Sequence, residues 1–305
     1  MRSLNFSNKS VQWVSLILLA LTWGSSFILM KKGLVYFDPS EVAAFRITLA
    51  WLVLLPIALR NLKVIRGNFW PLLVTGLFGN AIPAFLFALA QTQIPSALSG
   101  ILNSLTSLFT LLIGVILFRT KTTWMQVTGV LVALLGAAGL IGFDSISSFG
   151  AGSQYALLVV AATAMYGIAV NTIKAKLHEL RPTHITSLAF LFTGPWCALY
   201  LFFGTDFIHD LSARPESWMG VFYLSILAVV GTAIAVIIFN KLIKETTAVF
   251  ATTVTYLIPV VALGWGLIDG ETIELVDVAF MCLILAGIFM INIKNSGVWV
   301  NRFFR

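Results

Sequence analysis

The stretch LTWGSSFILMKK, residues 21–32, sets the pattern of this sequence. It is apolar on both sides of a Trp-Gly-Ser-Ser break and ends at two lysines. A second stretch, AMYGIAVNTIKAK at residues 164–176, also has an aromatic residue, a glycine, an apolar run and terminal lysines. When Trp23 is aligned with Tyr166, Lys31 falls on Lys174, 143 residues further on. The chain therefore carries one pattern twice.

The composition indicates that most of the chain lies in lipid. Of the 305 residues, 59% are hydrophobic and 10% are charged, and the mean hydropathy is +0.97. A soluble globular chain has about 25% charged residues, so we expect the lipid bilayer to be a partner. The net charge of +7 comes from short cationic runs between apolar segments. It does not come from a basic face interleaved with aromatics, and we predict no nucleic-acid binding.

Ten apolar runs are long enough to cross a bilayer as helices, which takes about 20 residues. The sequence therefore predicts an all-α polytopic membrane protein with ten transmembrane helices. The runs are separated by short polar segments, so consecutive helices should be antiparallel neighbours. Their approximate ranges are 11–30, 41–59, 69–90, 96–118, 123–142, 153–173, 184–204, 217–239, 247–268 and 275–293.

The cations predict the orientation. If the N-terminus is cytoplasmic, fifteen of the 19 Lys and Arg residues fall on the cytoplasmic side. Three fall on the other side (Lys31, Lys32 and Arg214), and Arg46 lies within a span. This bias follows the positive-inside rule. We predict an integral membrane protein of a bacterial inner (plasma) membrane with both termini cytoplasmic.

The repeated pattern extends to later spans. At a shift of 151 residues, Ala97 falls on Ala248 and Gly136 falls on Gly287. This predicts two five-helix repeats, residues 1–148 and 149–305, and since five is odd they are inverted relative to each other. Inverted repeats recur in secondary transporters, with the substrate site between the halves. Chance similarity between hydrophobic helices is the alternative.

Several segments carry a family resemblance. They are WGSSF (23–27), PSEVAAFRITLAWLVLLP (39–56), PSALSGILNSLTSLFTLLIGVILF (95–118), QVTGVLVALLGAAGL (126–140) and the long stretch at 231–273. In order and spacing the chain resembles the drug/metabolite transporter superfamily, in particular its ten-helix EamA-type members. The resemblance implies a permease or exporter of a small organic metabolite, with helices 1–4 and 6–9 around a cavity. The family proline and glutamate are matched by Pro259 and Glu271, but the first half has Leu108 and Thr120 in their place.

Arg46 is the charged residue that lies inside a span, where a cation is expensive and often functional. It is suited to binding an anionic group of the substrate, such as the carboxylate of an amino acid. Alternatively it snorkels toward the interface or pairs with Glu41, about 7.5 Å along the helix at 1.5 Å per residue. The sequence leaves both interpretations open.

We expect a substrate cavity from residues that are aromatic, small, polar or helix-kinking within spans. The alternative role for each is packing between helices. The candidates are Trp23, Gly24, Ser25, Arg46, Asn80, Pro83, Asn103, Tyr166, Asn171, Thr255, Tyr256 and Pro259.

No pattern in the sequence indicates an enzyme. The three histidines are isolated near loops, the two cysteines lack CxxC spacing, and no paired carboxylates lie deep in a span. We therefore predict no catalytic residues, no metal and no cofactor, and movement of a small-molecule substrate by alternating access. A membrane-embedded receptor or scaffold without transport is the alternative. The small residues in runs 123–142 and 275–293 also allow a homodimer through helices 5 and 10.

Overall fold

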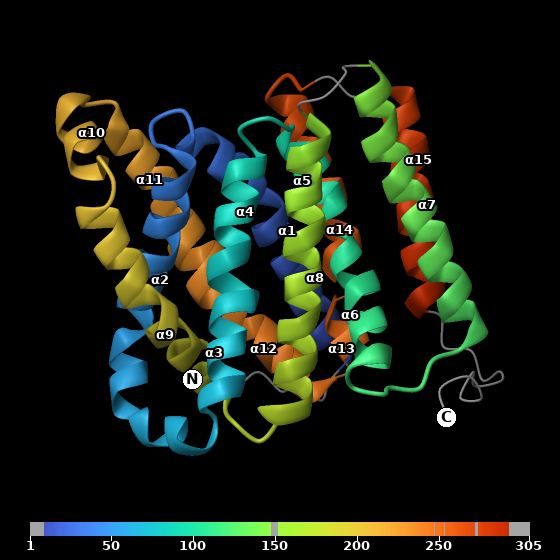
Figure 1. Cartoon of the computed structure of the whole chain (residues 1–305), viewed down its shortest axis with the longest axis horizontal. Coiled ribbons are helices and arrows are strands. Elements are labelled where there is room, and N and C mark those ends of the chain that lie inside the picture. The colour runs from blue at the N-terminus through green and yellow to red at the C-terminus, as the bar shows by residue number, and fades with distance from the viewer. Residues whose placement is uncertain (1–8, 148–151, 247, 253, 272–273, 293–305) are drawn as a thin grey trace.

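The computed structural model describes residues 9–147, 152–246, 248–252, 254–271 and 274–292, which form a bundle of helices (Figure 1). Eight helical segments in this range are long and apolar enough to cross a membrane. Two shorter apolar segments, Trp124–Ala137 and Val278–Ile291, lie in the fifth and tenth predicted spans. The prediction of an all-α polytopic membrane protein is confirmed.

The first five passes contain nine helical elements. They are α1 (Lys9–Gly33), α2 (Pro39–Arg60), η1 (Leu62–Gly67), α3 (Phe69–Gly76), η2 (Leu77–Ala81), α4 (Ile82–Ala90), α5 (Ser96–Leu102), α6 (Leu105–Ile116) and α7 (Trp124–Ser147). The last five passes have the same general order. They are α8 (Gly152–Lys176), α9 (Pro182–Phe203), α10 (Phe207–Ala213), α11 (Ser217–Ala228), η3 (Val229–Ile234), α12 (Ala235–Glu245), α13 (Ala248–Thr252), α14 (Val254–Ile268) and α15 (Leu275–Asn292).

Helix starts follow local sequence signals. Asp38 precedes α2, and its backbone N–H donates to Glu41 Oε2 at 3.0 Å. Pro39 occupies the first helical position, where a missing N–H is tolerated. Pro182 begins α9 in the same way. These signals set the short connections that keep consecutive passes antiparallel.

The structure corrects three details of the predicted spans. The fourth span is not continuous, because α5 ends at Leu102 and α6 begins at Leu105. The third and eighth spans each contain a π-helical turn, η2 and η3. A short helix, α10, lies in the segment predicted as a loop before span eight. Hydropathy over 20 residues averages out such local changes in hydrogen bonding.

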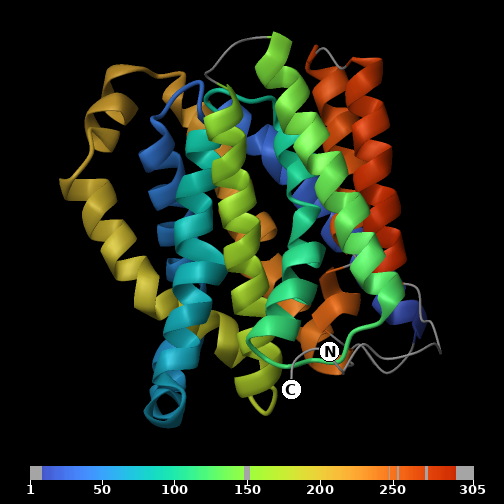
Figure 2. The same cartoon turned by 45° about the vertical axis from the view of Figure 1, so that its right-hand side comes forward.

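Helices α7 and α15 lie side by side at one edge of the bundle (Figures 1 and 2). Their contact uses glycines: a Cβ placed on Gly129 would lie 2.6 Å from the Gly287 carbonyl oxygen. A Cβ on Gly136 would lie 2.8 Å from the Ile284 nitrogen. These small residues of the two spans therefore pack against each other within one chain.

The outer surface is apolar, as contact with lipid requires. Phe203, Leu135 and Ile268 are exposed to 85%, 66% and 78%. Because the number of passes is even, Lys9 and Asn292 lie at the same end of the bundle. Lys174 also lies there, and we call it the Lys174 end. We call the opposite end the Lys31 end.

Candidate functional site

A central cavity lies between the helices, and its empty volume including its opening is about 980 Å³. Its walls come from both halves of the sequence. The lining residues are Trp23, Ser26, Phe27, Met30, Arg46, Ile47, Thr75, Gly79, Asn80, Phe87, Asn103, Thr106, Tyr166, Ala169, Val170, Ile173, Thr232, Val236, Phe239, Asn240 and Thr255.

Both π turns contribute to the cavity wall. In η2, Asn80 Nδ2 donates to the Thr75 carbonyl at 3.1 Å, and in η3, Thr232 Oγ1 donates to the Leu227 carbonyl at 2.9 Å. Each side chain thus binds the carbonyl five residues before it. The two turns lie 152 residues apart, close to the shift that aligns the two halves. Single π turns inside α-helices often mark functional sites.

Pro83 follows the first π turn, as expected of a residue that cannot donate a backbone hydrogen bond. The position corresponding to Pro83 in the second half is Ala235, which has a backbone N–H. That N–H donates to the Val230 carbonyl, five residues before it. Proline is therefore not required for the π turn of the second half.

Arg46 faces this cavity. Its Nε donates to Thr232 Oγ1 at 2.7 Å, which joins α2 to the π turn of the other half. Glu41 instead accepts from the Asp38 backbone, and the described residues contain no ion pair between Arg46 and Glu41. The interpretation in which Arg46 pairs with Glu41 is therefore wrong.

One side of the cavity is aromatic. Trp23 Nε1 donates to the Gly231 carbonyl at 2.9 Å, and this bond holds the indole against the second half. The Trp23 and Phe239 rings meet edge to face, with centroids 5.0 Å apart. Phe87 lies 6.1 Å from Tyr166 in a stacked arrangement. These rings offer an apolar surface wide enough for a flat or aliphatic group.

Neutral polar groups complete the lining. Asn103 lies at the break between α5 and α6, and it is 8% exposed. Thr106 Oγ1 is buried with no hydrogen-bond partner among the described residues. Thr255 Oγ1 lies 3.1 Å from Ser107 Oγ and donates to the Thr252 carbonyl at 2.7 Å. Asn103 therefore leaves hydrogen-bonding capacity available in the cavity wall, whereas the Thr106 hydroxyl is covered.

Six of the candidates from sequence meet in the cavity wall. They are Trp23, Arg46, Asn80, Asn103, Tyr166 and Thr255. Five others are not among its lining residues. They are Gly24, Ser25, Pro83, Asn171 and Pro259. The side chain of Tyr256 lies outside the described part of the chain.

The candidates outside the lining make packing contacts. Gly24 packs closely against α14, because a Cβ placed on it would lie 2.5 Å from Val261 Cβ. Ser25 Oγ accepts from Trp265 Nε1 at 2.8 Å. Asn171 Nδ2 donates to the carbonyls of Thr110 and Gly167. Trp23 and Gly24 are adjacent, so one short motif supplies both a cavity wall and a close helix contact.

Several lining residues were not predicted from the sequence, among them Thr232, Phe239 and Thr106. A signal for Thr232 was available, because Gly79-Asn80 and Gly231-Thr232 occupy corresponding positions in the two halves. The resemblance implied that helices 1–4 and 6–9 surround the cavity. Among the described residues, α9, the seventh pass, supplies none of the lining.

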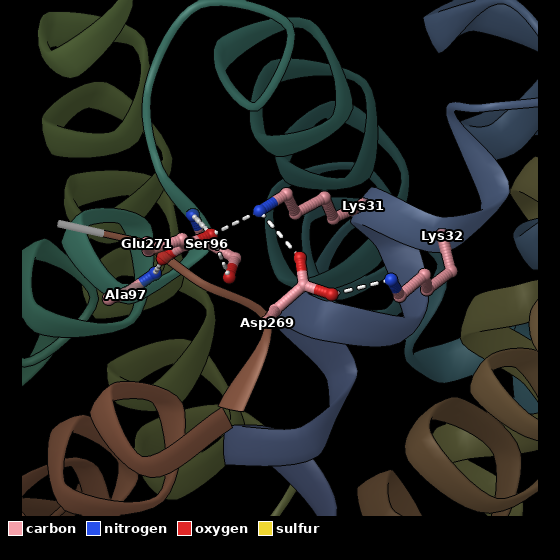
Figure 3. A network of polar contacts seen from close by, with 6 residues as sticks. All are labelled: Lys31, Lys32, Ser96, Ala97, Asp269 and Glu271. Carbon is pink, nitrogen blue, oxygen red and sulfur yellow. Dashed lines mark hydrogen bonds and ion pairs between the residues drawn. The ribbon is translucent and has the colours of Figure 1, made fainter. Parts of the chain in front are cut away.

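A network of charged groups lies at the Lys31 end (Figure 3). Lys31 Nζ lies 2.7 Å from Asp269 Oδ2 and 2.7 Å from Glu271 Oε1, and Lys32 pairs with Asp269. Glu271 also accepts from the backbone N–H and hydroxyl of Ser96 and from the Ala97 N–H. The carboxylate therefore stabilises the N-terminus of α5 and holds Lys31 of α1 at once.

The charges around these carboxylates change their proton affinity. Hydrogen bonds from Lys31 and Lys32 hold the pKa of Asp269 below its usual value. Burial acts to raise the pKa of Glu271, but the hydrogen bonds from Lys31, Ser96 and Ala97 outweigh it and leave that pKa lowered. Both groups are therefore ionised at neutral pH.

The Lys174 end is built differently. Lys174 Nζ donates to the carbonyls of Ile243, Lys244 and Thr246, at the C-terminus of α12. A helix C-terminus is favourable for a cation. Lys244 Nζ in turn donates to the Leu180 carbonyl at 3.2 Å. The partners of the two lysines are main-chain oxygens of the same sequence half.

The loops after the fourth and ninth passes share one backbone feature. Gly270 and Arg119 have φ angles of 80° and 54°, and each precedes the residue that closes the turn. Glu271 N donates to the Gly266 carbonyl, five residues before it, at 2.9 Å, and Thr120 N donates to the Gly114 carbonyl, six residues before it, at 3.0 Å. The two loops therefore differ by one residue in the closed turn and in the side chain that they present.

Among the described residues, no group of three or more His, Cys, Asp or Glu side chains is placed to hold a metal ion. The lining of the cavity has no cluster of ionisable groups on which to base a cofactor site. The chemistry it offers is recognition by one guanidinium, several neutral polar groups and aromatic rings.

A polytopic helical protein with a largely apolar cavity between its two halves, in which a few polar groups are placed, fits the class of membrane transporters. The EamA-like transporter family model matches residues 11–142 and 153–293, so this chain belongs to that family. It is an integral membrane protein that transports small metabolites.

Named relatives cover almost the whole chain. An uncharacterized transporter of Archaeoglobus fulgidus is 24% identical, over 93% of this chain and 99% of that protein. The uncharacterized inner membrane transporter YedA of Escherichia coli is 25% identical, over 92% of this chain and 90% of that protein. The "probable terminal-alkyne amino-acid exporter" of Streptantibioticus cattleyicolor is 23% identical, over 93% and 94%. A crystal structure at 19% identity covers 93% of this chain and 97% of its own with a TM-score of 0.65, so the fold is shared.

Proposed function

We propose that this protein moves an amino acid or a related small compound across the membrane by alternating access, with the central cavity as its substrate site. The observation that carries the proposal is the cavity around Arg46, lined by both halves of the chain. The name of the Streptantibioticus relative, a probable terminal-alkyne amino-acid exporter, supports the same substrate class.

The two halves, residues 1–148 and 149–305, form inverted repeats in this proposal. The corresponding π turns, the matching loops at Arg119 and Gly270, and the family's two matches support that division. Rocking of one half against the other then opens the cavity to each side in turn. Arg46 and Trp23 bind the second half at Thr232 and Gly231, so both contacts lie where the halves meet.

In the membrane, we place the Lys174 end in the cytoplasm together with both termini. The charge bias of the loops supports this orientation. The name of YedA as an inner membrane transporter supports a bacterial inner membrane. The Lys31 end then faces outward, and its ion network closes the outer mouth of the cavity.

The candidates that line the cavity are the proposed substrate contacts. Arg46 binds a carboxylate, Trp23 and Tyr166 pack against the body, and Asn80 and Asn103 offer amides. Gly24, Ser25, Pro83, Asn171 and Pro259 act through helix packing around the site, and Tyr256 remains a candidate. Because the relatives are named as transporters and exporters, we propose that the protein has no catalytic activity.

A homodimer through α7 and α15 also remains a proposal. Because their glycines face each other within one chain, a dimer would use the opposite faces, where Leu131 and Leu135 of α7 are exposed. Cys282 is a free, exposed thiol on α15 and tests this face directly. Treatment of membranes with a short bismaleimide should give a dimer, which the Cys282→Ser variant should not form. A wild-type protein that stays monomeric would contradict this interface.

Counterflow in proteoliposomes tests the transport proposal. Proteoliposomes that contain the purified protein are loaded with an unlabelled compound, and uptake of the labelled compound is measured. The panel covers amino acids, nucleobases and other small metabolites, with and without a pH gradient. Saturable exchange of one compound, weakened at least tenfold by Arg46→Gln, is the expected result. Arg214→Gln, which removes an exposed arginine outside the spans, is the matched control. Folded protein that exchanges no compound would instead favour a receptor or scaffold.

A further inference from the structure

We propose that the central cavity selects compounds that carry one carboxylate, no ammonium group and an apolar or aromatic body, in preference to zwitterions and amines. Examples of this chemical class are 2-oxo acids, aryl carboxylates and N-acylated amino acids. The inference rests on the proposed function and narrows it, because among amino acids and related compounds it assigns the cavity to the related compounds that lack the ammonium group.

The charge of the lining carries this inference. Arg46 is the charged residue among the described lining residues, which include no Asp, Glu, Lys or His. Its Nε is engaged by Thr232, and the described residues give no partner to its two terminal amino groups. The pairs Lys31–Asp269 and Lys31–Glu271 satisfy each other at the end of the bundle and do not line the cavity. The empty cavity therefore carries one uncompensated positive charge.

Each type of substrate changes that charge differently. A monocarboxylate neutralises it, and the guanidinium offers the paired donors that match a carboxylate. A zwitterion leaves the net charge at one and brings its ammonium close to Arg46. An amine raises the net charge to two. Since uncompensated charge is strongly unfavourable away from water, the expected order of binding is monocarboxylate, zwitterion, amine.

The neutral groups do not reverse this order. Asn103 can hydrogen-bond a carbonyl, amide or hydroxyl group of a substrate, but it supplies no negative charge. The aromatic rings of Trp23, Phe87 and Tyr166 offer an apolar surface to the body of the compound. A cation–π contact with a ring would be weaker than a carboxylate counter-charge in the same enclosed space.

Three compounds with the same phenyl body separate these possibilities: 3-phenylpropanoate, phenylalanine and 2-phenylethylamine. Each is tested for counterflow in proteoliposomes and for a shift in the melting temperature of the purified protein. We expect 3-phenylpropanoate to bind about tenfold to hundredfold more tightly than 2-phenylethylamine, as charge-assisted hydrogen bonds imply. Phenylalanine should lie between them.

Variants at Arg46 add a second test. Arg46→Gln should abolish the preference for 3-phenylpropanoate, whereas Arg46→Lys should keep the order with weaker binding, and Arg214→Gln should behave as wild type. If Arg46→Gln does not fold, the wild-type order still decides.

The outcomes distinguish the two proposals. Wild-type preference for phenylalanine or 2-phenylethylamine overturns the charge selection and leaves transport intact. Folded protein that neither exchanges nor binds any compound of the three or of the wider panel overturns both the inference and the proposed function.

Discussion

The two ends of the bundle hold corresponding lysines in different ways. Lys31 is paired with Asp269 and Glu271, so a cation of the first half is held by anions of the second. Lys174 is held by main-chain carbonyls at the end of α12, within its own half. Each supporting loop has a residue of positive φ before its closing hydrogen bond, but one presents Glu271 and the other presents Thr120.

This difference shows that corresponding positions of the two halves can be linked in unequal ways. A carboxylate at one loop position links the halves by charge, while a threonine at the matching position leaves them without that link. In the proposed alternating-access mechanism, single side chains would then set how firmly the halves are held together at each end. In the orientation proposed above, the charged closure faces outward.

Removal of the Glu271 carboxylate should have the largest effect. Glu271→Gln leaves Lys31 with less counter-charge and weakens the cap of α5, so we expect the free energy of unfolding to fall by about 2–3 kcal/mol. Thermal unfolding in detergent measures the change. Glu216→Gln, at an exposed site outside the network, is the matched control. Equal melting temperatures for the two variants would mean that the ion network does not stabilise the contact between the helices at the Lys31 end.

Acidification should release the Lys31 end alone. The lowered pKa values of Asp269 and Glu271 mean that their stabilisation is complete above the ordinary carboxylate pKa, near 4, and is lost as pH falls through the lowered values. Pairs of spin labels across each end measure the separation as a function of pH. The label pair at the Lys31 end should separate in strong acid and that at the Lys174 end should not. The same response at both ends would contradict the comparison.

Making the two ends alike should slow transport. Thr120 corresponds in position to Glu271, so Thr120→Glu places a carboxylate on the matching loop. A Cβ on Gly114 would contact both Thr120 and Asn171, and Asn171 lies one turn of α8 before Lys174. The new carboxylate should therefore lie within reach of Lys174. A new ion pair of about 1 kcal/mol should reduce the exchange rate about fivefold by holding that end closed. Thr120→Gln, which has the same shape and no charge, is the control. Unchanged exchange with Thr120→Glu would show that this loop does not approach Lys174.

The smallest effect is expected for Lys32. Its side chain is 43% exposed, and Asp269 keeps Lys31 as a partner when Lys32 is removed. Lys32→Met should change the free energy of unfolding by about 0.2–1 kcal/mol. The same unfolding measurement checks it, and a loss as large as that of Glu271→Gln would show that the two lysines act as one unit.

The spans were predictable because a bilayer demands long apolar helices, and runs such as 69–90 satisfy that demand directly. Arg46 and Asn80 were predictable as candidates because polar groups in lipid need a protein partner or a cavity. The partners were not predictable. Thr232 reaches Arg46 across 186 positions of sequence, and the choice depends on a π turn that hydropathy does not reveal.

The Lys31 network illustrates the same limit. The sequence places Asp269 and Glu271 at the end of a span, but it does not indicate that Glu271 caps α5 at Ser96, 175 positions earlier. Such contacts depend on how the halves pack. The break at Asn103 and Ser104 was missed for a similar reason, because both residues are common inside transmembrane helices as well as at their breaks.

The π turns also have a consequence for how the length of the chain can vary. A π turn contains one residue more than the α-helical turn it replaces, so deletion of one residue from η2 could restore a regular helix. Because the extra residue is accommodated within the turn, Thr75 before it and Phe87 after it would keep nearly the same orientation toward the cavity. The change would fall on Asn80 and its bond to the Thr75 carbonyl. A single codon gained or lost in either turn is thus a way to change the polar groups of the cavity wall while the helices on both sides keep their register.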